Sequence, residues 1–190
     1  MTVGKALHDD VTDAIGAAFF EELAVTGYGR LSVDSVAKRA GVGKAAIYRR
    51  WPSKQRMAIE LISSVAVAAV EAPDTGSLRG DIRQFLANAR DALSHPLARP
   101  IVPDLLAEAH RNPELADALL STVRDPRRAK AGALVERAIA RGELPADTDV
   151  DLCLDFLAGP LYWRLTAINT DPGPDYLDRL TDKLVAAFHA

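Results

Sequence analysis

The sequence predicts an all-α protein built from two parts. Apolar residues recur at steps of three and four along most of its 190 residues, which is the spacing of one face of a helix. Runs of alternating β-branched and polar residues, the pattern typical of strands, are absent. Turn-forming residues separate the helical segments, and their densest cluster, residues 72–77, indicates a linker. The composition, 48% hydrophobic and 26% charged, is that of a folded globular protein.

The first part, residues 1–72, is expected to contain four helices. The first ends near Gly27, and Ser32 is a suitable N-cap for the second, which the run Gly41-Val42-Gly43 ends. A short helix over residues 44–50 follows, and then a long one over about 54–71. The apolar stripe of the first helix consists of Leu7, Val11, Ile15, Ala18, Phe19 and Leu23.

The second part, residues 73–190, is predicted to be helical throughout. Its helices are expected over residues 78–94, 98–111, 113–123, 126–141, 148–169 and 174–189. The segment 148–169 is apolar over most of its circumference, so it must be covered on several sides. Pro160 lies inside this segment and should kink it, because proline has no backbone N–H to donate.

Charge is distributed unevenly along the chain. The formal net charge is −3, yet residues 30–56 hold eight basic residues against the single acid Asp34, a local charge of +7. The rest of the chain then carries 15 basic and 25 acidic residues, or −10. A basic segment within an acidic protein indicates a local surface for nucleic acid.

Residues 32–50 have the form of a helix, a tight glycine turn and a second helix. In helix-turn-helix proteins the second helix enters the major groove of DNA while the first crosses the backbone. Gly41 can adopt the positive φ that such a turn requires. Ala45 and Ala46 leave the second helix slim enough to approach base edges, and the cations around them can reach phosphates. The segment therefore predicts DNA binding.

The stretch LSVDSVAKRAGVGKAAIYRRWPSKQRM, preceded by AIGAAFFEELAVTGYGR, resembles the N-terminal domain of the tetracycline-repressor (TetR) family of bacterial transcriptional regulators. The resemblance covers about residues 7–62. It implies a homodimeric repressor that binds a pseudo-palindromic operator in double-stranded DNA and is released by a small-molecule ligand. On this basis residues 1–72 are expected to form the DNA-binding domain, with its motif at 32–51, and residues 73–190 the ligand-binding and dimerisation domain.

The resemblance also assigns DNA contacts by position. Base contacts are implied for Lys44, Ala45 and Ala46, with which we group Arg49, a residue that could touch either a base or a phosphate. Phosphate contacts are implied for Ser32, Tyr48, Arg50 and Lys54. Two positions depart from the family pattern. Gly43 stands where Ser or Thr usually caps the second helix, and Arg50-Trp51 stands where His-Phe is frequent.

The second part offers weaker candidates. By resemblance, the last two long helices form the dimer interface, for which we expect Leu154, Leu157, Leu161, Leu165, Leu177 and Leu184. Apolar residues available for a ligand pocket are Phe85, Leu86, Leu105, Leu106, Leu119 and Tyr162. No metal or cofactor is expected, since Cys153 is the only cysteine and the histidines lack metal-ligand spacing.

Two other functions compete with DNA binding. An enzyme is not expected, because the sequence holds no nucleophile elbow, metalloprotease motif or glycine fingerprint after a strand. The alternative is a helical interaction module whose basic segment binds an acidic protein or a membrane surface. A membrane is not expected as partner, because the segment 44–50 has mostly alanine opposite its cations and no apolar run reaches about 18 residues. The expected location is the cytoplasm.

Overall fold

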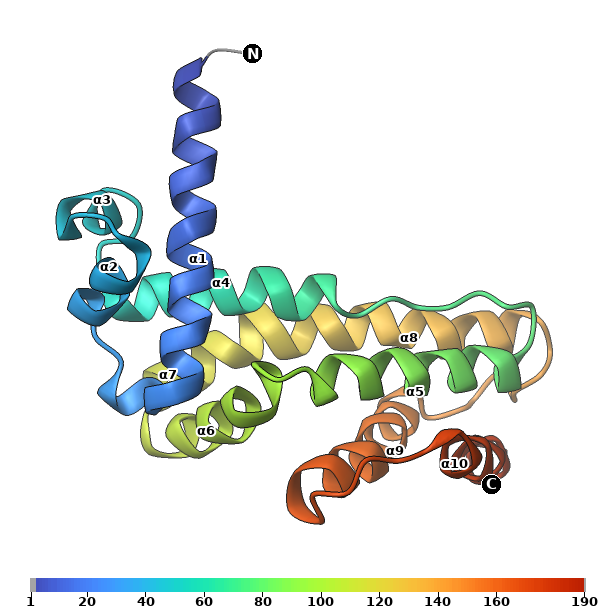
Figure 1. Ribbon diagram of the computed structural model, residues 1–190. Helices are drawn as coiled ribbons and strands as arrows, with labels where there is room; N and C mark the ends of the chain where they lie inside the picture. Colours follow the sequence, from blue (N-terminus) through green and yellow to red (C-terminus); the bar gives the residue numbers. More distant parts are fainter. Residues whose placement is uncertain (1–2, 190) are drawn as a thin grey trace. The chain divides into compact units, whose positions relative to one another are not determined.

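The computed structural model describes residues 3–189, with side chains described for residues 10–189 (Figure 1). These residues form helices and loops without a strand, which confirms the predicted all-α class. They fall into two compact units. The first unit contains the chain up to Ser64 together with Pro96–Leu120, and the second contains Val65–His95 and the chain from Ser121 onward. The side chain of Leu7 lies outside the described residues.

The first unit is organised around α1 (Val3–Arg30), beside which α2 (Val33–Ala40) and α3 (Lys44–Tyr48) lie (Figure 1). Most of α4 (Lys54–Ala68) belongs to this unit, as do α6 (Ala98–Arg111) and α7 (Pro113–Leu119). The predicted stripe of α1 supplies the core, where Ile15, Phe19 and Leu23 are fully buried. Buried residues from α2, α3, α4 and the loop before α4 join them, namely Val36, Ile47, Met57 and Trp51. This core fixes α2 and α3 against α1.

The second unit contains α5 (Leu78–Ser94), α8 (Asp125–Ala140), α9 (Val150–Tyr162) and α10 (Pro174–Phe188). Helix α5 packs against the other three. Its apolar face enters a core shared by all four helices, to which Ile82, Leu86, Leu134 and Leu157 contribute fully buried side chains.

Some element boundaries differ from those predicted. Helix α4 ends at Ala68, before the expected residue 71. The predicted helix over 113–123 is divided into α7 and a π-helical turn, η1 (Leu120–Arg124), which runs directly into α8. A second π-helical turn, η2 (Trp163–Ala167), follows α9, three residues after Pro160. Such turns carry an extra residue, which apolar periodicity alone does not reveal.

A buried carboxylate holds the predicted linker onto the second unit. Asp81 is 0% exposed, and its Oδ1 accepts hydrogen bonds from the Thr75 backbone N–H at 2.6 Å and hydroxyl at 2.8 Å. Its Oδ2 accepts a hydrogen bond from Arg141 at 3.0 Å. Burial favours the neutral acid, but the bonds from Thr75 and Arg141 outweigh it and lower the pKa of Asp81. The negative charge therefore stabilises this fold of the chain.

Across the described residues, no helix combines the length and the apolar character needed to cross a membrane.

Candidate nucleic-acid interface

Local hydrogen bonds fix the beginning and the end of α2. The Ser32 side chain accepts the backbone N–H of Ser35 at 3.0 Å, and the Ser35 hydroxyl accepts the N–H of Ser32 at 3.3 Å. These reciprocal bonds form a capping box. At the other end Gly41 has a φ of 67°, and the N–H of Val42 donates to the Ala37 carbonyl at 3.0 Å. The positive φ that the turn was predicted to require is present, and it turns the backbone from the end of α2 toward α3.

One side of α3 is exposed to solvent, and the other side packs into the core of the first unit. Ile47 is buried, whereas Lys44, Ala45, Tyr48 and Arg49 are exposed. Positions i, i+1, i+4 and i+5 lie on one face of a helix, so these four residues form one exposed surface. We call it the α3 face. Ala46, the remaining predicted base contact, is only half exposed because it lies at the edge of this face.

Lys44 already has a partner in the protein. Its Nζ lies 2.6 Å from Oδ2 of Asp34 on α2, and both side chains are more than half exposed. Ion pairs at this exposure contribute only about 0–1 kcal/mol, so Lys44 can exchange Asp34 for another acceptor at little cost. Asp34 is the one acid of the basic segment, and its role was not predicted.

Arg50 connects α3 to α1. Its Nε donates to the Thr12 hydroxyl at 2.8 Å, and its NH1 donates to the carbonyl of Ala46 at 2.9 Å. The side chain is half-buried. The phosphate contact implied for Arg50 stays a prediction, and the observed bonds give this residue a positioning role that the sequence did not reveal.

Lys54 is engaged in a similar way at the start of α4. Its Nζ donates to the Tyr28 carbonyl at 3.0 Å and lies 4.5 Å from the centre of the Tyr28 ring. The backbone N–H of Tyr28 donates to Oδ2 of Asp104 on α6 at 2.8 Å. Burial, with a contribution from the charge of Glu108, raises the pKa of the Tyr28 hydroxyl. Tyr28 therefore links α4 and α6 to the end of α1.

The remaining cations of residues 30–56 divide into paired and unpaired ones. Arg39 forms ion pairs with Glu22 at 2.8 Å and Glu21 at 3.4 Å, on the α1 side. Lys38, Arg49 and Arg56 are exposed and have no side-chain partner among the described residues. Arg30 is also exposed, and its Nε donates to the Thr26 carbonyl at 3.0 Å. These four cations, together with the exchangeable Lys44, give residues 30–56 exposed positive charge.

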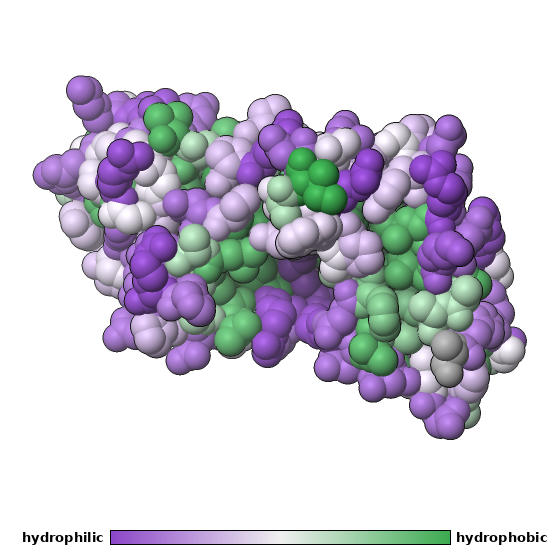
Figure 2. Space-filling view, turned by 90° about the horizontal axis from the view of Figure 1, so that it is seen from below, coloured by the Kyte–Doolittle hydropathy of each residue, from purple (hydrophilic) through white to green (hydrophobic). Residues whose placement is uncertain are grey.

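The leucines predicted at a dimer interface lie inside the second unit, and their contact with a second chain stays a prediction. All six are at most 9% exposed, and they belong to the core of the unit: Leu154, Leu157, Leu161, Leu165, Leu177 and Leu184. Side chains already covered by their own chain offer little surface to a second one. The large apolar residues of α9 and η2 that do reach the surface are Leu152, Phe156 and Trp163. Figure 2 shows one face of the protein, with apolar residues (green) among hydrophilic ones (purple).

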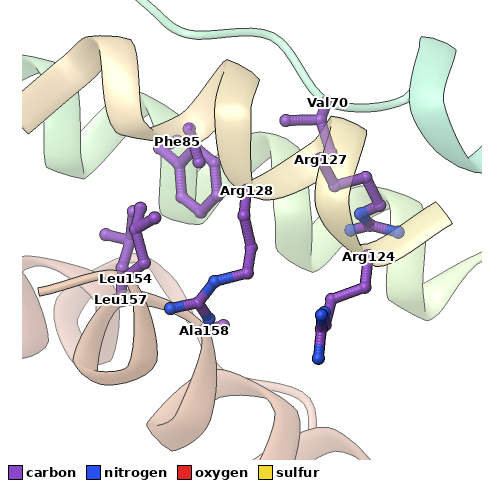
Figure 3. A pocket seen from close by; sticks show the side chains of 9 residues that line it. Val70, Phe85, Arg124, Arg127, Arg128, Leu154, Leu157 and Ala158 are labelled. Carbon is purple, nitrogen blue, oxygen red and sulfur yellow. The ribbon is translucent and has the colours of Figure 1, made fainter. Parts of the chain in front are cut away.

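The second unit contains a pocket of about 210 Å³ (Figure 3). Its apolar lining comes from Val70, Phe85, Ala131, Leu154, Leu157 and Ala158, and its charged lining from Arg124, Arg127 and Arg128. We call it the arginine pocket. Of the predicted pocket residues, Phe85 lines it. Leu86 is buried in the core, Tyr162 is half-buried outside the lining, and the others belong to the first unit, namely Leu105, Leu106 and Leu119.

Within the described part of the chain, no group of three or more His, Cys, Asp or Glu side chains could hold a metal ion.

Comparison with known proteins assigns the chain to a family. Residues 15–61 match the family described as bacterial regulatory proteins, tetR family, and residues 72–184 match the tetracyclin repressor-like C-terminal domain. The chain belongs to the TetR family. This TetR-family protein is a DNA-binding transcriptional regulator, in a family of ligand-responsive regulators. The predicted boundary between residues 72 and 73 stays a prediction.

Individual relatives agree with the family assignment. An HTH-type transcriptional regulator of Mycobacterium bovis is 36% identical, over 87% of this chain and 84% of its own length. A DNA-binding transcriptional repressor, TetR of Mycobacteroides abscessus, is 34% identical over 80% of each chain. The crystal structure of the TetR family transcription regulator SCO0332 has a TM-score of 0.73 and 26% identity, and covers 93% of this chain and 97% of its own. These TetR-family matches are to regulators of transcription rather than to enzymes.

Proposed function

We propose that this TetR-family protein is a cytoplasmic repressor that binds a pseudo-palindromic operator as a homodimer and leaves it when a small molecule binds the second unit. The observation that carries the proposal is the α3 face, an exposed helical surface with cations, held on a helix-turn-helix scaffold. The name of the Mycobacteroides abscessus relative, a transcriptional repressor, supports repression over activation.

The proposed base contacts come from the α3 face. Lys44 and Arg49 carry the hydrogen-bond donors, and they fit guanine, which presents two acceptors in the major groove. Ala45 and Ala46 allow close approach and can touch the methyl group of thymine. When Lys44 turns to a base, Asp34 loses its partner but stays exposed to water, so the exchange costs little.

The proposed phosphate contacts come from around the α3 face. Tyr48 is exposed and has a hydroxyl group to offer. Ser32 is also exposed, and its hydroxyl would exchange its bond to Oγ of Ser35 for a phosphate oxygen. Arg50 and Lys54 hold the scaffold through the bonds described above, and both are cations at the border of the α3 face. A phosphate oxygen would compete with these bonds for their N–H groups. Phosphate contacts of this kind set the position of the protein on DNA, while the α3 face selects the sequence.

The proposed dimer interface uses the exposed side of α9 rather than its buried leucines. Leu152, Phe156 and Trp163 are 52%, 45% and 62% exposed, and their spacing of four and seven residues places them on one face of the helix. Gly159 lies on the same face, where no atom comes within 4 Å of an added Cβ. An apolar helix face with a glycine at its centre allows a second helix to approach closely.

Selection of bound sequences from random duplex DNA tests this function. The full chain should enrich a site with two inverted halves whose centres are one helical turn, about 34–36 Å, apart. Lys44→Ala should change the enriched sequence, whereas Arg79→Ala, which removes an exposed arginine of the second unit, should not. Transcription from a promoter that carries the selected site should fall as the protein is added.

Binding to anionic vesicles decides between DNA binding and the alternative of a basic interaction module. Across a salt series, duplex binding should show a steep salt dependence together with a sequence preference that persists at high salt. Binding to vesicles and to all duplexes alike, with no enriched sequence, would overturn the proposal.

A further inference from the structure

The arginine pocket has an unusual division of charge. Its apolar lining comes from α5, α8 and α9 and from Val70, and its three charged lining residues are all cations from the end of η1 and the first turn of α8. No carboxylate is among the residues that line it. In Figure 3, Arg124 and Arg128 extend in the direction of the α9 side, where Ala158 lies, while Phe85 and Leu154 lie together at one end. A ligand here would meet apolar carbon and positive charge.

Two of the three arginines are neutralised by acids outside the pocket. Nε of Arg124 donates to Oδ1 of Asp125 at 2.8 Å. Arg128 donates to the carboxylates of Asp151 and Asp155, the latter at 2.7 Å, and these bonds raise the pKa of its guanidinium. The side chains of Asp125, Asp151 and Asp155 are more than half exposed, so these three acids face solvent.

Arg127 is different. Its side chain forms no hydrogen bond and no ion pair with any of the described residues. Its exposure is intermediate, and burial lowers the pKa of its guanidinium, which shows that it gives up hydration without receiving a counter-charge. A partly dehydrated cation of this kind favours any anion that can reach it.

We propose that the arginine pocket binds a singly charged organic acid with a compact apolar body, and that Arg127 holds its carboxylate. The planar fork of a guanidinium matches the two oxygens of a carboxylate. The three acids that pair with Arg124 and Arg128 equal the three arginines in number, but none of them contacts Arg127. One carboxylate would therefore supply the contact that Arg127 lacks. This inference names the chemical class of the small molecule in the proposed function. Binding of the acid does not depend on that function; only release of the DNA by the acid rests on it.

The size of the pocket limits the apolar body. An apolar protein cavity of about 150 Å³ holds benzene. A pocket of about 210 Å³ therefore accommodates one ring or a short aliphatic chain together with the start of an acidic arm. The apolar part would lie against Phe85, Leu154 and Leu157.

A matched set of probes tests the inference on the full-length protein. Calorimetric titration compares 3-phenylpropionate and octanoate with the neutral 3-phenylpropanamide and the cationic 3-phenylpropylamine. A charged hydrogen-bond partner should make 3-phenylpropionate bind about tenfold to a hundredfold more tightly than its amide. The amine should bind most weakly, because it would add a fourth cation to the pocket.

Variants assign the effect to Arg127. Arg127→Gln should weaken binding of 3-phenylpropionate about tenfold or more and leave binding of the amide unchanged. Arg127→Lys should lose less, because it keeps the charge without the fork. Ala158→Phe should weaken both probes by filling the pocket. Arg79→Gln is the matched control and should leave every affinity unchanged, since Arg79 pairs with Asp182 outside the lining.

The inference is overturned if no probe binds at millimolar concentration, if acid and amide bind equally, or if Arg127→Gln leaves acid binding unchanged. In the last two cases the stem of Arg127 merely covers apolar surface. The selected duplex serves as an independent readout. A protein that binds the duplex but no acid refutes the ligand class alone, whereas one that binds acid but no duplex refutes the proposed function alone. Release of the duplex by the acid supports both.

Discussion

Lys54 shows how a single residue of the first unit can serve both the fold and the DNA. Its ammonium donates to the Tyr28 carbonyl and lies over the Tyr28 ring. Hydrogen bonds from charged donors contribute about 1.5–3 kcal/mol, and a cation over an exposed aromatic ring about 0.5–1 kcal/mol. A change at Lys54 should therefore affect stability as well as binding.

We expect Lys54→Ala to lower the free energy of unfolding by about 1–3 kcal/mol. It should also weaken binding to all duplexes alike and reduce the salt dependence, because the proposed phosphate contact would be lost. Urea unfolding and a salt series of DNA titrations measure the two effects. Lys38→Ala is the control, since Lys38 is exposed and has no partner among the described side chains, and it should leave stability unchanged. An unaltered unfolding curve for Lys54→Ala would contradict the structural role.

Asp81 gives a pH dependence to the second unit. Its pKa is lowered in the folded protein, so the folded state favours the carboxylate more than the unfolded state does. The resulting stabilisation is present above the unfolded pKa of about 3.9 and disappears as the pH falls through the lower folded pKa. The sign follows from the bonds of Thr75 and Arg141, which require the ionised form.

Asp81→Asn should lower the free energy of unfolding at pH 7 by about 2 kcal/mol. It should also make stability fall less steeply than in the wild type as the pH drops below about 4, since the titrating group is gone. Urea unfolding at pH 7, 5 and 3 measures both. Asp182→Asn, which removes an exposed carboxylate paired with Arg79, should change little. Equal acid sensitivity of Asp81→Asn and wild type would count against this account.

At the scale of the element, the end of α1 is the point where three helices meet. Gly27 has a φ of 73°, and the Tyr28 N–H that follows is accepted by Asp104 of α6. A Cβ at Gly27 would lie 2.6 Å from Oδ1 of Asp104. The close approach of α6 to α1 therefore depends on glycine at this position, and the bond to Asp104 holds the two helices in register.

Asp104→Ala should loosen this junction. The Tyr28 N–H would lose its acceptor, which costs about 1–3 kcal/mol where water cannot replace it. Hydrogen exchange should become faster for the amides of residues 27–31, and operator affinity should fall because Tyr28 also positions Lys54. Asp13→Ala, an exposed change on the same helix α1, provides the comparison. Unchanged protection of the Tyr28 amide would show that the bond does not hold the junction.

The elements that the sequence predicted well are those with local signals. Ser32 and Gly41 mark the ends of α2 through bonds to residues at most five positions away, so the helix-turn-helix could be predicted from the stretch itself. The hydrogen bond from Tyr28 to Asp104 joins residues 76 positions apart, and no local sequence pattern predicts it. The same holds for Arg50 and Thr12. Sequence reasoning therefore predicted which residues form the surface of the candidate site, and it missed the long-range bonds that hold that surface in place.

The helix 148–169 shows a second limit. Its apolar character on all sides predicted that it would be covered, but not by what. Leu154, Leu157 and Leu161 face the core of their own unit, and Phe156 and Trp163 face outward. Leucine packs equally well in a core and in an interface, so the sequence alone could not tell which apolar residues of this helix its own unit would cover.

At the scale of the whole molecule, two copies are needed to present two α3 faces to one operator. Phe156→Glu tests this need, because a charge in an apolar interface without a partner strongly opposes association. Sedimentation should show a monomer, and operator affinity should fall at least a hundredfold while the helical circular dichroism stays unchanged. Val25→Glu, at an exposed apolar residue of the first unit, should remain dimeric. A dimer that survives Phe156→Glu would place the interface elsewhere.

The chemistry of Cys153 makes the spacing of those two faces measurable. The thiol is buried, and burial, together with the charge of Asp149, raises its pKa, so it reacts slowly with alkylating reagents. A cysteine introduced at the exposed Lys38 would therefore accept a fluorescent dye or a nitroxide selectively while the native cysteine is kept. Each protomer would carry one label on α2, and the separation between the labels could be followed in solution as operator and organic acid are added.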